Sequence, residues 1–211
     1  MTRIYWIGFA VLTAALVLPG SAFAQLDPLH GPLVVPWYLI PCEDMPGCFT
    51  YLDGTCHCEQ GPPRQEYVSV TNTGESGGVS PGGDLCADIY VFHSDQQMSE
   101  CCGCKVTPDG LLTLGLRSNL LSNPLTGVVG KSGTIRIVSS VPNGGLCDAS
   151  SPGGTAELVA WGTPLGTSAF TETAFKEAAF NASELSKLAT ECGFIQAHGS
   201  GHGVCRCPSG Q

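Results

Sequence analysis

The chain has 211 residues and a formal net charge of −9 at pH 7, and only 13% of its residues are charged. An acidic chain is repelled by nucleic acid and by anionic membrane surfaces, so we expect neither as a partner. The length is enough for one ordinary domain with a hydrophobic core, together with a small appendage.

Residues 1–24 have the composition of a signal peptide. Arg3 supplies a short positive region, residues 4–18 form an apolar run without charge, and Ala22-Phe23-Ala24 places small residues where a signal peptidase needs them. The run is short for a membrane span, which needs about 20 residues. We therefore expect cleavage before Gln25, a secreted or cell-envelope location, and no transmembrane segment in the mature protein.

Residues 25–62 are expected to form a small lobe rich in proline and cysteine. Four prolines in its first half exclude a helix and favour extended chain; they are Pro28, Pro32, Pro36 and Pro41. Four cysteines follow closely, and Gly61-Pro62-Pro63 has the composition of a linker.

Residues 63–211 are expected to form the main domain, and its first part alternates with a period of two. Strands are predicted over residues 67–71, 87–93, 110–117, 134–139 and 156–161. In the second of these, Ala87 and Ile89 share one face while Asp88 and Tyr90 share the other. Both faces are partly apolar, which predicts a central strand. Gly, Pro, Ser and Asn clusters separate the strands, as in an antiparallel sandwich.

The period changes to that of a helix near residue 172. Residues 172–180 are rich in Ala and Phe, and Asn181 with Glu184 forms a capping box before a helical face that includes Leu188 and Cys192. Gly193 stands where a left-handed C-cap is expected. The predicted fold class is mainly β (α+β): an antiparallel β-sandwich-like domain with one or two C-terminal helices and many disulfides.

All twelve cysteines are candidates for disulfide bonds, because exported chains meet oxidants and the count is even. They are Cys42, Cys48, Cys56, Cys58, Cys86, Cys101, Cys102, Cys104, Cys147, Cys192, Cys205 and Cys207. Cysteines within one cluster bond each other poorly, so each cluster is expected to send ties to distant parts of the chain. Six bridges permit about ten thousand pairings, and the sequence selects none of them.

The C-terminal tail offers an alternative role for two cysteines. His198, His202, Cys205 and Cys207 together supply two imidazoles and two thiols, a ligand set that suits zinc or copper. The spacing is not that of common zinc modules, and export favours disulfides over thiolates. Disulfides with solvated histidines therefore remain the simpler interpretation, with a metal-binding or thiol-redox protein as the alternative.

No catalytic residue is assigned. Gly74-Glu75-Ser76-Gly77-Gly78 matches a serine hydrolase motif, and Thr55-Cys56-His57-Cys58 is similar to the histidine segment of trypsin-like proteases. The two segments are too close for the barrel that a trypsin-like triad requires, and no helix is expected after Ser76. An exported hydrolase stays as a second alternative. A carbohydrate-binding face would need exposed aromatics, and the mature chain has only two tryptophans, Trp37 and Trp161. Trp37-Tyr38 could form an exposed patch, but packing of the lobe against the domain is favoured.

Several segments resemble uncharacterised secreted cysteine-rich proteins of environmental bacteria. The segments that carry the resemblance are residues 85–92, the Cys101-Cys102-Gly103-Cys104 cluster, residues 110–114 and residues 199–205. The resemblance implies an exported β-rich protein and carries no activity with it. The expected function is a structural, adhesive or binding role outside the cell, with an extracellular protein or a polysaccharide as partner; the oligomeric state stays open.

Overall fold

The computed structural model describes residues 33–38, 41–52, 56–59, 66–74, 83–121, 123–153, 158–163, 173–174, 176–177, 181–199, 205 and 207. The strands are β1 (Leu33–Tyr38), β2 (Cys48–Thr50), β3 (Cys56–Cys58), β4 (Tyr67–Thr71), β5 (Leu85–His93), β6 (Met98–Val106), β7 (Leu111–Gly115), β8 (Ser132–Ser140), β9 (Val159–Thr163), β10 (Thr173–Ala174) and β11 (Lys176–Glu177). The helices are η1 (Cys42–Asp44), α1 (Leu116–Asn119) and α2 (Ala182–His198).

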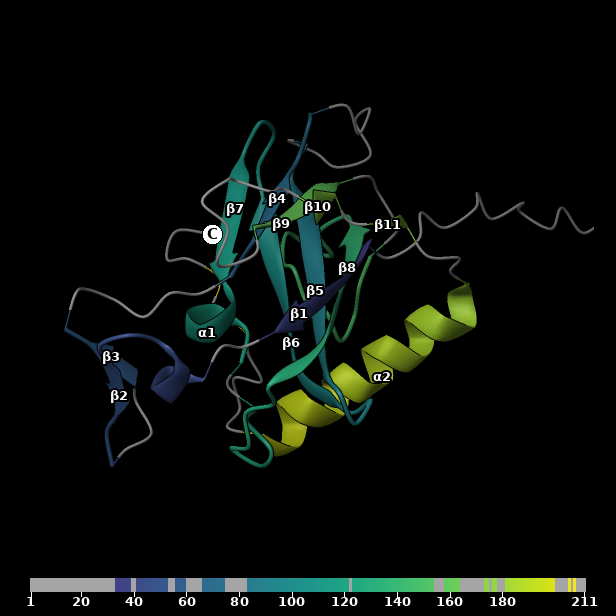
Figure 1. The fold of residues 1–211 in the computed structure, drawn as a ribbon. Coiled ribbons are helices and arrows are strands. Elements are labelled where there is room, and N and C mark those ends of the chain that lie inside the picture. Colours follow the sequence, from purple (N-terminus) through teal and green to yellow (C-terminus); the bar gives the residue numbers. More distant parts are fainter. Residues whose placement is uncertain are drawn as a thin grey trace, which may run out of the picture.

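Two antiparallel sheets form a sandwich (Figure 1). The first, sheet A, has the strand order β11-β1-β8-β5-β6, and the second, sheet C, has the order β10-β9-β4-β7. β5 pairs with β8 on one side and with β6 on the other, so it is the central strand that its two apolar faces predict. The expected fold class, a disulfide-rich α+β fold dominated by antiparallel sheets, is confirmed.

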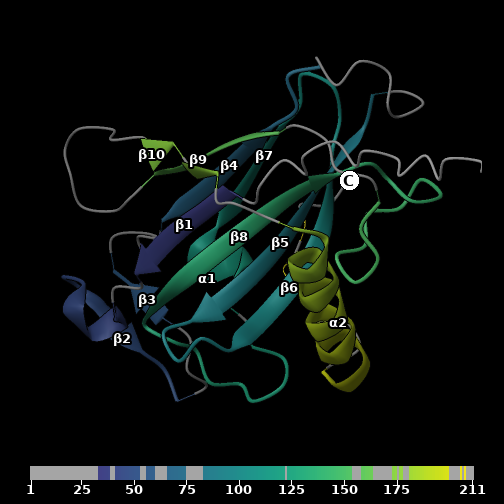
Figure 2. The same ribbon diagram turned by 90° about the vertical axis from the view of Figure 1, so that its right-hand side faces the viewer.

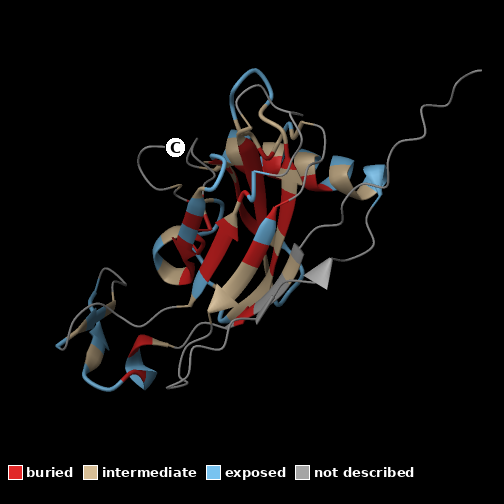
Figure 3. Cartoon of the chain, turned by 90° about the horizontal axis from the view of Figure 1, so that it is seen from above, coloured by how far each residue is buried: buried red, intermediate tan, exposed pale blue. Residues whose placement is uncertain are grey.

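The main core lies between the two sheets, where alternate side chains of each strand point inward. Ile89 and Val91 of β5 meet Val70 of β4 and Leu112 and Leu114 of β7 in this layer, and all five are fully buried. Figure 3 shows the buried positions concentrated in the sandwich. Burying one such aliphatic side chain contributes about 1.5–3 kcal/mol, so the alternating pattern accounts for the pairing of the two sheets.

A second core lies on the outer face of sheet A, beneath α2. Leu188, Cys192 and Ile195 of the helix pack against Tyr90 and Cys101 of β5 and β6. In Figure 2, α2 lies over the β6 side of sheet A, and Val138 of β8 is buried beside it in this second core. Earlier in β8, the outward residues Ser132, Thr134 and Arg136 are only partly buried.

The lobe expected at the N-terminus is smaller than the segment 25–62. β1 belongs to that segment, yet it pairs along its whole length with β8 in sheet A. The part that stands apart from the sandwich in Figure 1 consists of η1 and the β2–β3 hairpin. Its side chains are mostly exposed, with Cys42 and Met45 as its buried apolar residues among those described.

Several element predictions need correction. The strand β6 was not predicted, because its three cysteines hide the period of two. Residues 173–174 and 176–177 are short edge strands where the Ala- and Phe-rich composition predicted helix. α2 continues through Gly193 to its C-cap at Gly199, because the helical face extends to Ile195.

The capping box is half formed. Asn181 Oδ1 accepts the backbone N–H of Glu184 at 2.9 Å, as predicted. The Glu184 carboxylate does not reach back to the cap and instead pairs with Arg136 of β8. Within the described ranges, no helix is both long and apolar enough to cross a membrane.

Candidate functional site

All twelve cysteines lie among the described residues, and each is in a disulfide. The pairs are Cys42–Cys56, Cys48–Cys58, Cys86–Cys147, Cys101–Cys192, Cys102–Cys205 and Cys104–Cys207. The first two staple the small lobe, and the other four tie β5 and β6 to the loop after β8, to α2 and to the tail. The clusters thus bond to distant partners and not within themselves.

Strand β6 is the anchor of the C-terminal region because its cysteines alternate between its faces. Cys101 points outward and bonds Cys192 of α2, while Cys102 and Cys104 point away from that face and bond the tail. The sulfur atoms of Cys102 and Cys104 lie 3.7 Å apart, and the sulfur of Cys207 lies within 4.8 Å of both. In bonded form these sulfurs are not the thiolates that a metal ion requires.

The metal site proposed for the tail does not form from the residues described. Cys205 and Cys207 are committed to Cys102 and Cys104. His198 stacks on Phe194 at 4.3 Å between ring centroids, and its Nδ1 lies 3.0 Å from the Phe194 carbonyl oxygen. His202 lies outside the described residues. The zinc or copper interpretation therefore loses both of its sulfur ligands.

The serine hydrolase motif gains nothing from the structure. His57 lies on β3 of the small lobe, where its ring contacts Tyr51 at 4.5 Å and Phe49 at 6.5 Å between centroids. Ser76 lies outside the described residues. The surroundings of His57 are an exposed aromatic cluster and not a cleft.

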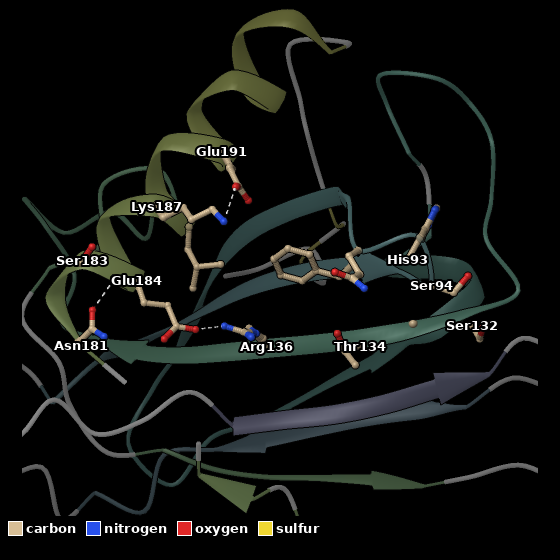
Figure 4. A pocket seen from close by; sticks show the side chains of 14 residues that line it. His93, Ser94, Ser132, Thr134, Arg136, Asn181, Ser183, Glu184, Lys187 and Glu191 are labelled. Atoms are coloured by element: carbon tan, nitrogen blue, oxygen red, sulfur yellow. Dashed lines mark hydrogen bonds and ion pairs between the residues drawn. The ribbon is translucent and has the colours of Figure 1, made fainter. Parts of the chain in front are cut away.

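An open groove lies between α2 and the first half of β8, with a volume of about 850 Å³ (Figure 4). Its floor comes from the end of β5 and from β8, where the alternating residues Ser132, Thr134 and Arg136 line it. Its wall comes from the first half of α2. The lining consists of Phe92, His93, Ser94, Gln96, Ser132, Gly133, Thr134, Arg136, Asn181, Ser183, Glu184, Lys187, Leu188 and Glu191.

Two ion pairs line this groove. Arg136 of β8 pairs with Glu184 of α2, and its guanidinium carbon lies 5.8 Å from the centre of the Phe92 ring. Lys187 lies 3.8 Å from Glu191 one helical turn further on. Both pairs are partly or largely exposed, and such pairs contribute only about 0–1 kcal/mol. These four side chains can therefore leave their present partners for the charged groups of a ligand at little cost in free energy.

The far end of the groove contains His93 and several hydroxyl groups. His93 Nε2 accepts the backbone N–H of Gly130 at 3.4 Å, and its ring meets the edge of Trp37 at 5.8 Å. Partial burial lowers the pKa of His93, against the opposing effect of Asp95. Over the described ranges, no hydrogen bond joins His93 to Ser94 or Ser132. Because the Gly130 N–H occupies Nε2, this nitrogen is not the base that a serine nucleophile at Ser94 or Ser132 would need.

A buried carboxyl lies beneath the loop that follows β8. Asp88 of β5 accepts a hydrogen bond of 2.6 Å from Ser140 Oγ, and its other oxygen has no hydrogen-bond partner among the described residues. Burial raises the pKa of Asp88 to about 7; the Ser140 hydrogen bond opposes this effect and the nearby charge of Asp148 adds to it. This carboxyl lies on the central strand beneath the loop that carries Asp148 and Ala149.

Asp148 holds the same loop against α2. Its Oδ1 accepts bonds from the backbone and the hydroxyl of Ser150 and from Gln196 Nε2 of the helix. Burial alone works to raise the pKa of Asp148, but these hydrogen bonds together keep it below its ordinary value. Tyr90 Oη completes the attachment with a 2.8 Å bond to the Ala149 carbonyl, and burial raises the pKa of Tyr90.

Nothing in the sequence marks the groove residues as a site, although Asn181, Glu184 and Leu188 predict the helix that forms its wall. The one signal in the sequence is the polar row of Ser132, Thr134 and Arg136, which alternates with the apolar residues Ile135 and Ile137 along β8. Such a row is typical of a solvent-facing strand, so composition alone does not separate a groove from an ordinary surface.

Comparison with protein-family models, with curated proteins and with solved structures finds no match. Six disulfides and no free cysteine in a chain of this size are typical of proteins that fold in an oxidising, extracellular or periplasmic compartment.

Proposed function

We propose that this protein is a non-catalytic binding protein of the cell exterior or envelope, and that the groove between α2 and β8 holds a polypeptide segment of a partner. The single observation that carries this is the open groove of about 850 Å³, which is lined by two weak ion pairs, one between β8 and α2 and one within α2. A groove of this size lies in the range of ligand sites.

The charges in the groove favour a peptide over other polar ligands. Arg136 and Lys187 offer positive charge, and Glu184 and Glu191 offer negative charge, so neither a polyanion nor a polycation is complementary along the whole length. A polypeptide brings side chains of both signs, together with backbone donors and acceptors for the hydroxyl groups of β8. Phe92 on the floor and Leu188 on the helical wall add apolar surface.

The alternatives have less support. A hydrolase would need a nucleophile within hydrogen-bond reach of a base, and a thiol-redox protein would need a reactive thiol where the structure has bonded cysteines. Binding requires neither.

The test exchanges the charges without removing the ion pair. A library of random peptides displayed on phage is selected on the secreted protein, and the enriched peptides are measured by titration against variants. The double variant Arg136→Glu, Glu184→Arg keeps an ion pair but inverts the charges that a ligand meets. We expect it to weaken binding at least about tenfold.

The matched control is the Lys105–Asp84 pair, whose Nζ–Oδ2 distance is 3.3 Å and whose exposure is similar to that of the Arg136–Glu184 pair. The double variant Lys105→Asp, Asp84→Lys should leave peptide affinity unchanged. If no peptide is enriched, or if the groove and control swaps have equal effects, the groove is not a peptide site.

A further inference from the structure

The outer face of sheet C is without charge. β4 lies between β7 and β9, and its inward residues Val68 and Val70 are buried in the core. The alternate residues therefore point away from the sandwich, in three rows that the strand register defines. The rows are Leu111-Thr71-Val159, Thr113-Ser69-Trp161 and Gly115-Tyr67-Thr163. We call these nine residues the outer C face.

Large apolar side chains on this face are open to solvent. Leu111 is 58% exposed, Val159 is 46% exposed and Tyr67 is 43% exposed, while Trp161 is half-buried in the middle row. The face also carries four aliphatic hydroxyl side chains, and Ser69 Oγ lies 3.4 Å from Thr113 Oγ1. An exposed patch of this kind marks an interaction site more often than isolated surface residues do.

The absence of charge on these nine positions restricts the ligand. The chain has 27 acidic and basic side chains (18 and 9), yet none stands on the outer C face. A charged polymer or an anionic lipid surface would find no counter-charge there. The complementary ligand is uncharged, offers apolar surface to the aromatic rings, and offers hydroxyls to the Ser and Thr side chains.

We propose that the outer C face binds a neutral polysaccharide. Tyr67 on β4 and Trp161 on β9 are diagonal neighbours, about 7–8 Å apart on adjacent strands. Aromatic faces carry negative charge density and attract the C–H groups on the apolar face of a sugar ring. The hydroxyls of Thr113 and Thr163 can both donate and accept hydrogen bonds, as sugar hydroxyls do, whereas Thr71 Oγ1 donates to the Gly110 carbonyl at 2.9 Å and offers a ligand only an acceptor.

Protein interfaces have a different composition. Their buried centres are enriched in Tyr, Trp, Phe, Met and Arg and depleted in Ser. The outer C face has two aromatic residues but no Arg and no Met, and hydroxyl side chains separate its apolar groups. This composition favours a polysaccharide over a second copy of the chain. The inference is independent of the groove, which lies on sheet A.

The test measures binding of the full secreted chain to insoluble cellulose, insoluble chitin and a soluble mixed-linkage β-glucan, with alginate as a charged polymer. We expect retention by at least one neutral polymer and none by alginate. Tyr67→Ala and Trp161→Ala should each weaken that binding about tenfold. Tyr67→Phe and Trp161→Phe should keep most of it, because each retains a ring.

Phe49→Ala is the matched control, because Phe49 is an equally exposed aromatic on the small lobe. Tyr67→Ala keeps the test valid if the half-buried Trp161 variant fails to fold. Three results would overturn the proposal: no neutral polymer retains the protein, Tyr67→Ala binds like the natural chain while Phe49→Ala does not, or sedimentation shows a dimer that Tyr67→Ala dissociates.

Discussion

Replacing Asp88 by Asn should stabilise the protein at neutral pH, and the gain should depend on pH. Asp88 is fully buried, and its pKa is raised from the ordinary value of 3.8 to about 7. The difference between these values corresponds to about 4 kcal/mol. Asparagine resembles the protonated carboxyl in shape, and its amide oxygen can accept the bond from Ser140 Oγ.

The sign follows from proton binding. Below pH 3.8 the carboxyl is protonated in the folded and the unfolded chain, so its full contribution to stability is present. Between pH 3.8 and about 7 the unfolded chain releases the proton while the folded chain keeps it, so stability falls as the pH rises. Above about pH 7 both states are ionised and the loss stays constant. Asp88→Asn removes this whole dependence.

The assay is urea unfolding at half-unit steps from pH 4 to pH 8, with disulfides intact, followed by the fluorescence of the buried Trp37. The difference in unfolding free energy between Asp88→Asn and the natural chain should grow by about 1.4 kcal/mol per pH unit and then level off near pH 7. Asp44→Asn, at an exposed carboxyl, is the control. A difference that stays flat from pH 4 to pH 8 would show that Asp88 is ionised in the fold throughout and would refute the reasoning.

Three further predictions concern the attachment of α2 and its neighbours. Asn181→Ala removes the helix cap and should cost about 1 kcal/mol in thermal unfolding, with no change in disulfide content. Changing Cys101 and Cys192 together to Ala should lower the free energy of unfolding by about 3 kcal/mol. The Cys102–Cys205 bridge already holds β6 to the tail, so the lost bridge closes an effective loop of only about 15 residues. A loss near zero in calorimetry would contradict the chain-entropy argument. Gly103→Ala places a Cβ 2.6 Å from the backbone of Cys147 and should lower the free energy of unfolding by about 1–3 kcal/mol. Gly193→Ala, inside α2, meets only an ordinary contact with Ser150 at 3.7 Å and should raise the melting temperature slightly, because alanine favours the helix more than glycine does.

The strands with simple alternation were predictable from sequence. Residues 67–71 and 87–93 alternate because one face enters the core, and the structure places them in β4 and β5. β6 was missed because Cys101, Cys102 and Cys104 fill both of its faces with the same residue type. Their burial is set by distant partners, Cys192, Cys205 and Cys207, and a local pattern carries no information about those partners.

The helix and the groove show a similar division. The cap at Asn181 is a local interaction and was predictable, but the partner of Glu184 is Arg136, 48 residues away. The groove exists because α2 lies over β6 and, among the described residues of the second core, packs on β8 only at Val138, and this position of the helix is fixed by Cys101–Cys192 and by the packing of Leu188. Strand pairing likewise overrides the helix that the composition of residues 172–180 favours, because residues 173–174 pair with β9 and residues 176–177 pair with β1.

The cross-links also explain why two broad surfaces can stay uncovered. A sandwich that relies on burial alone gains stability by covering its exposed apolar side chains. Here four bridges join β5 and β6 to the later parts of the chain and add stability that does not depend on burial. The groove lies on sheet A and the outer C face on sheet C, at opposite sides of one core. The two proposed ligands would therefore not compete for the same surface, and binding of a peptide should leave the affinity for a polysaccharide unchanged.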